Sequence, residues 1–159
     1  MTVYQENLDI KMDYVIEPLS VDFVDDVAEI EKECFSIPFK KEDILSYLNE
    51  SYWRFFVVRD KNEILGYISF TIILDEISIC NVAVSSKYRK IGIGKALVSF
   101  LLDYAKKNGV CKLFLEVRES NISAISLYEK FGFEKVGISK NHYSMPKENA
   151  LLMNLNFNY

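Results

Sequence analysis

The sequence predicts a mixed α/β fold, a twisted mixed β-sheet with helices on both faces, formed as a single domain over residues 1–159. The length supports this prediction, because 159 residues are enough to bury one hydrophobic core. Composition supports it too, since 50% hydrophobic and 26% charged residues are typical of a globular chain. Along the chain, the apolar pattern alternates between strand-like runs and runs with the helical period. Residues 1–11 show no such pattern and are predicted to be a disordered tail.

The first half of the chain combines two helices with an antiparallel set of strands. Ser20 can cap the first helix, because a serine side chain accepts a hydrogen bond from the first helical turn. Aromatic and β-branched residues favour three longer strands, with a polar turn at 60–63 between the first two. The expected elements are strands at 14–17, 54–59, 64–73 and 77–84, and helices after Ser20 and near 44–48.

The second half alternates helices and strands. Its first helix shows the clearest period in the chain, and both helices are followed by glycines that are typical of helix ends. The strand between them is almost continuously apolar, which predicts a central strand that is buried on both faces. The expected elements are a helix at 93–105, a strand at 112–117, a helix capped by Ser120 or Asn121, and closing strands at 136–138 and 151–155.

Composition also excludes several classes of protein. The longest apolar stretch is interrupted by polar residues and is shorter than the roughly 20 residues that a membrane-spanning helix needs. No secretory signal is visible, so a cytoplasmic protein without a membrane partner is predicted. Cys34, Cys80 and Cys111 lie far apart among apolar residues, which favours reduced structural thiols and no metal site. The acidic balance, a net charge of −4, argues against nucleic acid as a partner.

Charge is divided unevenly between the two halves of the chain. Residues 1–85 carry 17 acidic and 7 basic residues, whereas residues 86–159 carry 6 acidic and 12 basic residues. An excess of charge of one sign favours ligands of the opposite charge. The second half of the chain therefore suits an anionic ligand and the first half a cationic one. Two ordinary solvated surfaces would explain the same division.

A loop in front of the long helix carries two glycines among cations. The segment Arg89-Lys90-Ile91-Gly92-Ile93-Gly94-Lys95 can direct backbone N–H groups toward a phosphate at the helix N-terminus. A Walker loop is excluded because it requires a hydroxyl residue where Ala96 stands. A dinucleotide fingerprint is excluded because it requires a third glycine where Leu97 stands. The loop therefore predicts a diphosphate site of another kind, with an ordinary turn as the alternative.

This loop and its surroundings resemble a known family. Arg-Lys-Ile-Gly-Ile-Gly at 89–94, preceded by Asn-Val-Ala-Val at 81–84, is similar to the coenzyme A signature of the GCN5-related N-acetyltransferase (GNAT) superfamily. Leu-Glu-Val-Arg-Glu-Ser-Asn at 115–121, with Leu-Tyr at 127–128, resembles the ribosomal-protein-alanine N-acetyltransferase (RimI) branch. The similarity covers the chain from about residue 14 to residue 155. It implies the GNAT fold, whose two central strands splay apart at one end around the cofactor arm.

The resemblance also implies an activity and a set of site residues. It implies an N-acetyltransferase that uses acetyl-CoA without a metal and modifies a protein N-terminus, in this branch the terminal alanine of a small-subunit ribosomal protein. A protein with a free, basic N-terminal segment is then the expected partner. Glu116 would be the general base and Tyr128 the general acid. The residues implied in cofactor binding are Val82, Ala83, Val84, Arg89, Lys90, Ile91, Gly92, Ile93, Gly94, Lys95 and Asn121.

Three sites depart from the pattern of the branch, and all three concern the acceptor side. Phe39 stands where tryptophan is common, the segment Asn141-His142-Tyr143 replaces a tandem-tyrosine pattern, and Asn149 stands where an aspartate is usual. Phe39 and Tyr143 are predicted to contact the acceptor, with core packing as the alternative. His142 is interpreted as a loop or rim residue and not as a base.

Both catalytic assignments have a structural alternative. An acid after the apolar residues 113–115 is unusual in a buried strand, which favours a function for Glu116 over a solvated strand end. Tyr128 lies on the apolar face of its helix, and a core tyrosine with a hydrated hydroxyl would show the same pattern. The acceptor stays open between a protein N-terminus, a lysine side chain and a small amine. A non-catalytic acyl-CoA-binding module would retain the same loop.

Overall fold

The computed structural model describes residues 13–159, which form a seven-stranded sheet with helices on both faces. The tail expected at 1–11 lies outside the described residues. In the sheet the strands follow the order β1-β2-β3-β4-β5-β7-β6. The strands are β1 (Val15–Pro18), β2 (Trp53–Asp60), β3 (Glu63–Ile73), β4 (Glu76–Val84), β5 (Lys112–Arg118), β6 (Glu134–Ser144) and β7 (Lys147–Asn156). The helices are α1 (Val24–Cys34), α2 (Lys41–Leu48), α3 (Ile93–Lys107) and α4 (Ile122–Lys130), with short 3-10 turns at Val21–Phe23 and Ser86–Tyr88.

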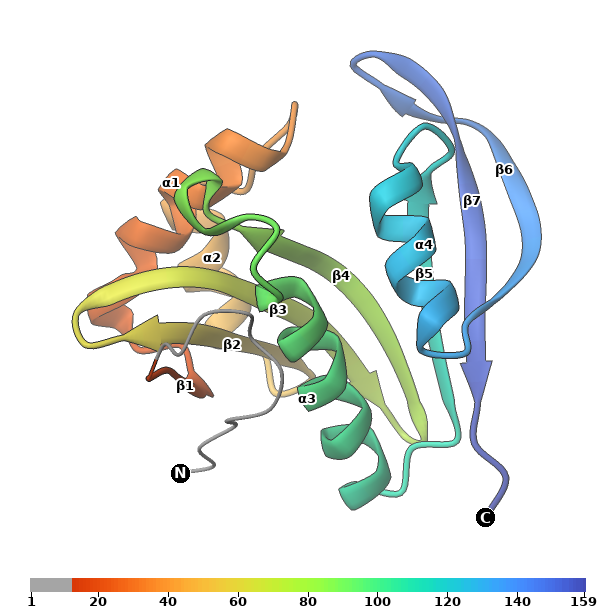
Figure 1. The fold of residues 1–159 in the computed structure, drawn as a ribbon, viewed down its shortest axis with the longest axis horizontal. Helices are drawn as coiled ribbons and strands as arrows, with labels where there is room; N and C mark the ends of the chain where they lie inside the picture. Colours follow the sequence, from red (N-terminus) through yellow and green to blue (C-terminus); the bar gives the residue numbers. More distant parts are fainter. Residues whose placement is uncertain (1–12) are drawn as a thin grey trace.

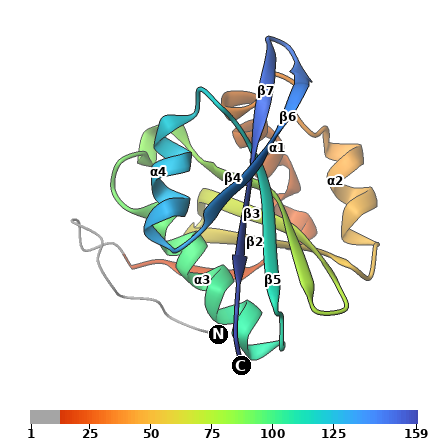
Figure 2. The same cartoon turned by 90° about the vertical axis from the view of Figure 1, so that its right-hand side faces the viewer.

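Two hydrophobic clusters hold the helices against opposite faces of the sheet. One cluster joins α3 and α4 to β3, β4, β5 and β7, and includes Leu97, Leu101, Leu113 and Met153, none of which is exposed. The other joins α1 and α2 to β2 and β3. Figure 2 shows the two helix pairs on either side of the sheet. The predicted mixed α/β fold with helices on both faces is confirmed.

Most local signals placed the helix ends correctly. The Ser20 hydroxyl accepts a hydrogen bond from the Asp22 N–H at 3.3 Å and caps the 3-10 turn at Val21–Phe23, whereas α1 itself begins after Phe23 without a side-chain cap. Asn121 caps α4 through the Ala124 N–H at 3.2 Å. Gly109 and Gly132, which follow α3 and α4, have the positive φ angles that favour glycine. No helix within residues 13–159 is long and apolar enough to cross a membrane.

The sheet divides between β4 and β5, the only parallel pair in its strand order. These strands pair at three positions, Glu76–Lys112, Ile77–Leu113 and Ser78–Phe114, and then separate (Figure 1). Just beyond the last pair, β4 contains a bulge: Ser69 of β3 faces Asn81 and the next residue faces Ile79, so Cys80 has no partner on β3. A bulge increases strand twist and interrupts the ladder, which fits its position where the two strands part.

The expectation that β5 is buried on both faces of the sheet was wrong. Leu113, Leu115 and Val117 are buried, but Glu116 between them is exposed. The reason lies in the second helix pair. Helices α1 and α2 contact β2, β3 and β4, so this face of β5 is left without a helical cover.

The closing hairpin is also longer than the apolar pattern predicted. Strand β6 spans eleven residues and β7 ten, whereas the sequence indicated only 136–138 and 151–155. Strand β6 is the outer strand of the sheet and most of its side chains are exposed, so a hydrophobic pattern could not reveal its full length. The difference matters because the extended part of this hairpin carries His142 and Tyr143.

The three cysteines are free thiols, as the sequence indicated. Burial raises the pKa of all three thiols above the ordinary value, and for Cys80 the pKa rises to about 11. A thiol with a raised pKa carries little thiolate at neutral pH and is a poor nucleophile. These raised pKa values fit the interpretation of the three residues as structural, which stays a prediction.

Candidate active site

Glu116 lies on β5 beyond the last pair with β4, where the two strands have separated. Its neighbours Leu115 and Val117 point into the core beneath α3 and α4, and side chains of a strand alternate between faces. Glu116 therefore points to the opposite face, with 38% of its side chain exposed. A partly exposed carboxylate at this position can reach an amine or a water molecule, as a general base must.

Glu116 has a direct partner that was not expected. The Nε2 atom of His142 lies 2.8 Å from Glu116 Oε2. His142 was expected in a loop or at a rim. The loop placement was wrong, because His142 is in strand β6. The contact was not visible in the sequence because it depends on the register of β6 against β7.

Tyr128 lies on α4 and is buried, with only 7% of the residue exposed. Its ring meets Phe133 edge to face at a centroid distance of 5.5 Å. Burial, with a smaller contribution from Tyr143, raises the Tyr128 pKa well above its ordinary value. The hydroxyl therefore stays protonated throughout the physiological range, as a proton donor requires.

Tyr143 connects the surroundings of both proposed catalytic groups. Its pKa is raised by burial and next by the charge of Glu116, while Arg118 acts in the opposite direction. Tyr143 in turn contributes to the raised pKa of Tyr128, so Tyr143 lies within electrostatic reach of both Glu116 and Tyr128.

Arg118 joins the two segments that border this region. Its guanidinium lies over the Tyr143 ring at 4.2 Å, a cation–π contact, and pairs with Glu148 at 3.3 Å. It donates to the carbonyl oxygens of Met145 and Pro146 at the tip of the β6–β7 hairpin, at 3.1 and 2.9 Å. It also reaches the Ser36 hydroxyl, in the segment between α1 and α2, at 3.3 Å. Only the family motif pointed to this arginine, and no local pattern predicted its contacts.

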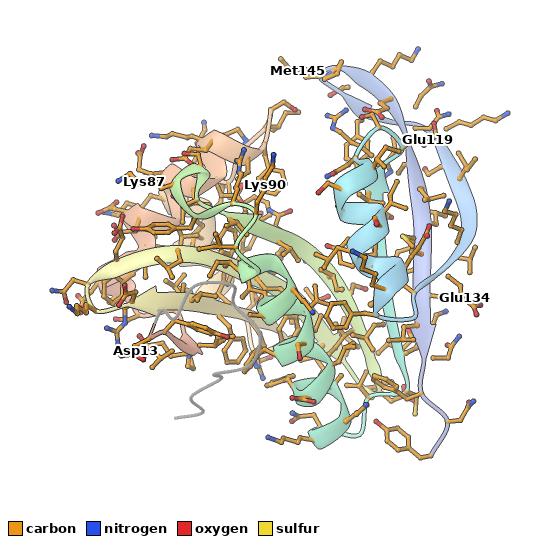
Figure 3. The ribbon with its side chains drawn as sticks, in the orientation of Figure 1. Asp13, Lys87, Lys90, Glu119, Glu134 and Met145 are labelled. Atoms are coloured by element: carbon orange, nitrogen blue, oxygen red, sulfur yellow. The ribbon has the colours of Figure 1, made fainter. Side chains whose placement is uncertain are left out.

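The glycine loop before α3 has the geometry of an anion site. Gly92, at φ 96°, precedes the helix, and no side chain caps this N-terminus. The first N–H groups of α3 are therefore available to a ligand, and the helix dipole favours an anion there. Lys90 and Lys95 are exposed on the same loop and first turn. Figure 3 shows Lys90 on one side of the separated strands and Glu119 on the other.

The remaining residues implied in cofactor binding lie around this loop. Val82, Ala83 and Val84 pair with β3 along one edge of β4. Their other edge has no partner on β5 among the described pairs, which leaves backbone groups for an extended ligand. These features fit the diphosphate and the amide-containing arm of coenzyme A.

Arg89 and Asn121 are already engaged within the protein. The Arg89 guanidinium lies 3.4 Å from the Val84 carbonyl and 3.4 Å from the Cys34 sulfur. Asn121 uses its Oδ1 atom to cap α4, so its amide Nδ2 is the atom left for a ligand. Their role in cofactor binding stays a prediction.

Phe39 lies in an aromatic cluster beneath the α1–α2 segment, and it is half-buried. Its ring meets Tyr47 at 5.2 Å and Trp53 at 6.4 Å, both edge to face. Part of the ring therefore serves packing, and its contact with an acceptor stays a prediction.

A buried carboxylate fixes the position of Phe39, and the sequence reasoning missed it. Glu31 on α1 is fully buried and accepts hydrogen bonds from the Phe39 N–H at 2.9 Å and from the Asn81 amide at 2.7 Å. Burial raises the Glu31 pKa, and these two hydrogen bonds lower it to a smaller extent. The signal was present, because Glu31 falls on the same helical face as Val27 and Ala28.

Glu31→Ala is expected to lower the free energy of unfolding by about 2–4 kcal/mol, because it removes the acceptor of two partly buried hydrogen bonds, from the Phe39 N–H and the Asn81 amide. Urea denaturation measures this change. Glu29→Ala, on the exposed face of the same helix, is the matched control and should leave the denaturation midpoint close to that of the parent. An equal response of the two variants would contradict a special role for Glu31.

The raised Glu31 pKa also predicts a pH effect. A carboxyl group with a raised folded-state pKa binds its proton more tightly in the folded than in the unfolded chain. The parent should therefore lose some stability as the pH rises through that pKa, and Glu31→Ala should lack this loss.

Comparisons with known proteins agree with this geometry. The Acetyltransferase (GNAT) family model matches residues 24–133. The ribosomal protein bS18-alanine N-acetyltransferase of Haemophilus influenzae is 38% identical over 128 residues, which cover 79% of this chain and 86% of that protein. The Escherichia coli protein of the same name is 34% identical over 128 residues, with the same coverage of 79% and 86%. A solved structure of the Escherichia coli enzyme has a TM-score of 0.85 at 30% identity, and the match covers 92% of this chain and 95% of that one.

The family model spans more than half of the chain, and these relatives are 34% and 38% identical over 79% of it. The chain therefore belongs to the GNAT family, in its ribosomal-protein-alanine N-acetyltransferase (RimI) branch, and is an acetyl-CoA-dependent N-acetyltransferase.

Proposed function

We propose that this enzyme acetylates the α-amino group of a protein, the N-terminal alanine of a small-subunit ribosomal protein. The observation that carries the proposal is the position of Glu116 on the uncovered face of β5, beyond the point where β4 and β5 separate. Similar proteins that are named for this substrate support the choice of acceptor.

The proposed reaction is a direct transfer with two proton steps. Glu116, acting directly or through water, takes a proton from the acceptor ammonium so that the neutral amine can attack. Tyr128 supplies a proton to the departing thiolate, and its raised pKa keeps this proton in place until it is needed. Acetyl-CoA, when bound, supplies an acetyl group as an activated thioester.

The proposed cofactor site uses backbone more than side chains. Val82 to Val84 would hydrogen-bond the extended arm along the open edge of β4. The uncapped N-terminus of α3 would bind the diphosphate, together with the cations of Lys90 and Lys95 and the loop of Arg89 to Gly94. Asn121 would contribute its amide Nδ2 from the start of α4.

An α-amino group suits a carboxylate base better than a lysine side chain does. The ordinary pKa of an α-amino group is about 7.7–8.0, roughly 2.5 units below that of lysine. Removing the lysine proton would therefore cost about 3.4 kcal/mol more at neutral pH, at 1.36 kcal/mol per unit. The acidic first half of the chain would favour a basic acceptor segment in addition.

Release of free thiol from acetyl-CoA with a panel of peptides tests this proposal. Peptides with a free N-terminal alanine followed by a basic segment are expected to react fastest, and peptides with an acidic segment more slowly. The same peptides with a blocked N-terminus and free internal lysines should not react.

Other outcomes of this panel would select another function. Reaction of the blocked peptides would indicate a lysine acetyltransferase, and preference for small amines would indicate a metabolite-modifying enzyme. Binding of the coenzyme without transfer to any acceptor would indicate a non-catalytic acyl-CoA-binding module. Each of these results would overturn the proposed acceptor.

A further inference from the structure

The chain contains one histidine, and the structure places it against the proposed general base. His142 Nε2 lies 2.8 Å from Glu116 Oε2. On the other side of the ring, Nδ1 lies 3.4 Å from the Ser139 hydroxyl, and the ring meets Tyr143 at a centroid distance of 4.8 Å. Each ring nitrogen of His142 therefore has a polar neighbour. Two such contacts are unusual for an exposed residue of an outer strand.

We propose that His142 is a positioning residue for Glu116. The inference rests on the proposed role of Glu116 in proton removal. It concerns the segment Asn141-His142-Tyr143, which departs from the tandem-tyrosine pattern of the branch.

The hydrogen-bond partners determine which nitrogen carries the proton in the neutral ring. A carboxylate only accepts hydrogen bonds, so Nε2 must donate to Glu116. Nδ1 is then the acceptor, and the Ser139 hydroxyl can donate to it. This arrangement holds the Oε2 atom of Glu116 in place and leaves Oε1 for the acceptor amine or for a water molecule.

The pair is poorly placed to serve stability alone. His142 has 34% of its side chain exposed and Glu116 has 38%. Partly exposed ion pairs of this kind contribute little to folding. Substitutions of His142 should therefore fold, and a change in their kcat would report on function.

The first test compares kcat and KM at pH 8 for the parent, His142→Tyr and His142→Phe. Tyrosine can still donate a hydrogen bond to Glu116, whereas phenylalanine cannot. His142→Phe should lower kcat/KM by about tenfold, and His142→Tyr by less, because it retains a donor. Lys140→Gln is the matched control, since it removes a charge from an exposed position of the same strand.

The division of the effect between kcat and KM separates positioning from a structural role. The loss in His142→Phe should appear in kcat, with the KM for the acceptor close to that of the parent and with partial recovery of kcat in His142→Tyr. Lys140→Gln should keep both values of the parent. Equal kcat values in the parent and His142→Phe, or no recovery in His142→Tyr, would overturn the inference.

The second test does not depend on acetyl transfer. Because His142 is the only histidine, its ring nitrogens give a single set of signals in long-range ¹H–¹⁵N NMR spectra. At pH 8 the parent should show the Nε2–H tautomer, and Glu116→Gln should shift the ring toward a mixture of tautomers. A mixture in the parent, or no change on substitution, would overturn the contact itself.

The two tests also distinguish this inference from the proposed function. If Glu116→Gln keeps near-normal turnover, the proposed role of Glu116 fails whatever the NMR spectra show, and the inference fails with it. If Glu116→Gln is inactive but His142→Phe keeps the kcat of the parent, the inference alone fails.

Discussion

Glu116→Gln is expected to lower kcat by about 10²–10⁴-fold, the usual contribution of a general base. Glutamine has almost the same shape and can still meet His142, but it cannot accept the proton of the ammonium group. The effect should therefore appear in kcat, with coenzyme affinity close to that of the parent. Steady-state thiol release measures the first quantity, and calorimetry with coenzyme A the second.

Glu119→Gln provides a matched control for this experiment. Glu119 lies three residues further along, after the end of β5, and its backbone N–H is bound to the Asn149 carbonyl at 3.2 Å. Removing its charge tests whether any carboxylate near the splayed strands matters. A loss in Glu119→Gln equal to that in Glu116→Gln would assign the effect to general electrostatics and contradict a specific base.

Tyr128→Phe is the second substitution with a large expected effect, a loss of about 10²–10⁴-fold in kcat. It removes the proposed proton donor and leaves the buried ring against Phe133. Because burial raises the Tyr128 pKa, the parent should keep its donor at alkaline pH, and no loss of rate near pH 9 should come from this residue. The pH profile of kcat, with coenzyme binding measured in parallel, checks both statements.

Tyr104→Phe is the control for removing a tyrosine hydroxyl elsewhere in the core. Tyr104 on α3 packs against Phe56 and Phe70, on the part of the sheet formed by β2 and β3. Turnover of Tyr104→Phe should match that of the parent. If Tyr128→Phe behaved in the same way, the hydroxyl of Tyr128 would be a packing feature and the acid would have to be sought elsewhere.

The cofactor side and the acceptor side of the proposed site depend on contacts over different distances in the sequence. The glycine loop that is proposed to bind the diphosphate is local, because Gly92 adopts a positive φ and α3 begins directly after it. The acceptor side is assembled from distant segments, because Arg118 reaches Ser36, 82 positions away, and also the hairpin at Met145. This difference explains why the loop could be recognised from residues alone and the acceptor side could not.

Errors in the sequence-based predictions have the same origin. The strand pattern of β5 was read as buried on both faces, because apolar residues alone do not show which helices will cover them. Strand β6 was predicted too short because an outer strand needs few apolar side chains. Glu31 was overlooked although its helical position was visible, because its partners Phe39 and Asn81 come from other elements.

By itself, the sequence determined the fold class, the family, most ends of the helices and the position of the glycine loop before α3. These features depend on hydrogen bonds and backbone angles within a few residues, so short patterns are enough to specify them. Only the tertiary structure decided which side chains meet at the reacting group, above all His142 against Glu116. Such a contact depends on the register of strands β5, β7 and β6, and that register is set by packing of the whole sheet.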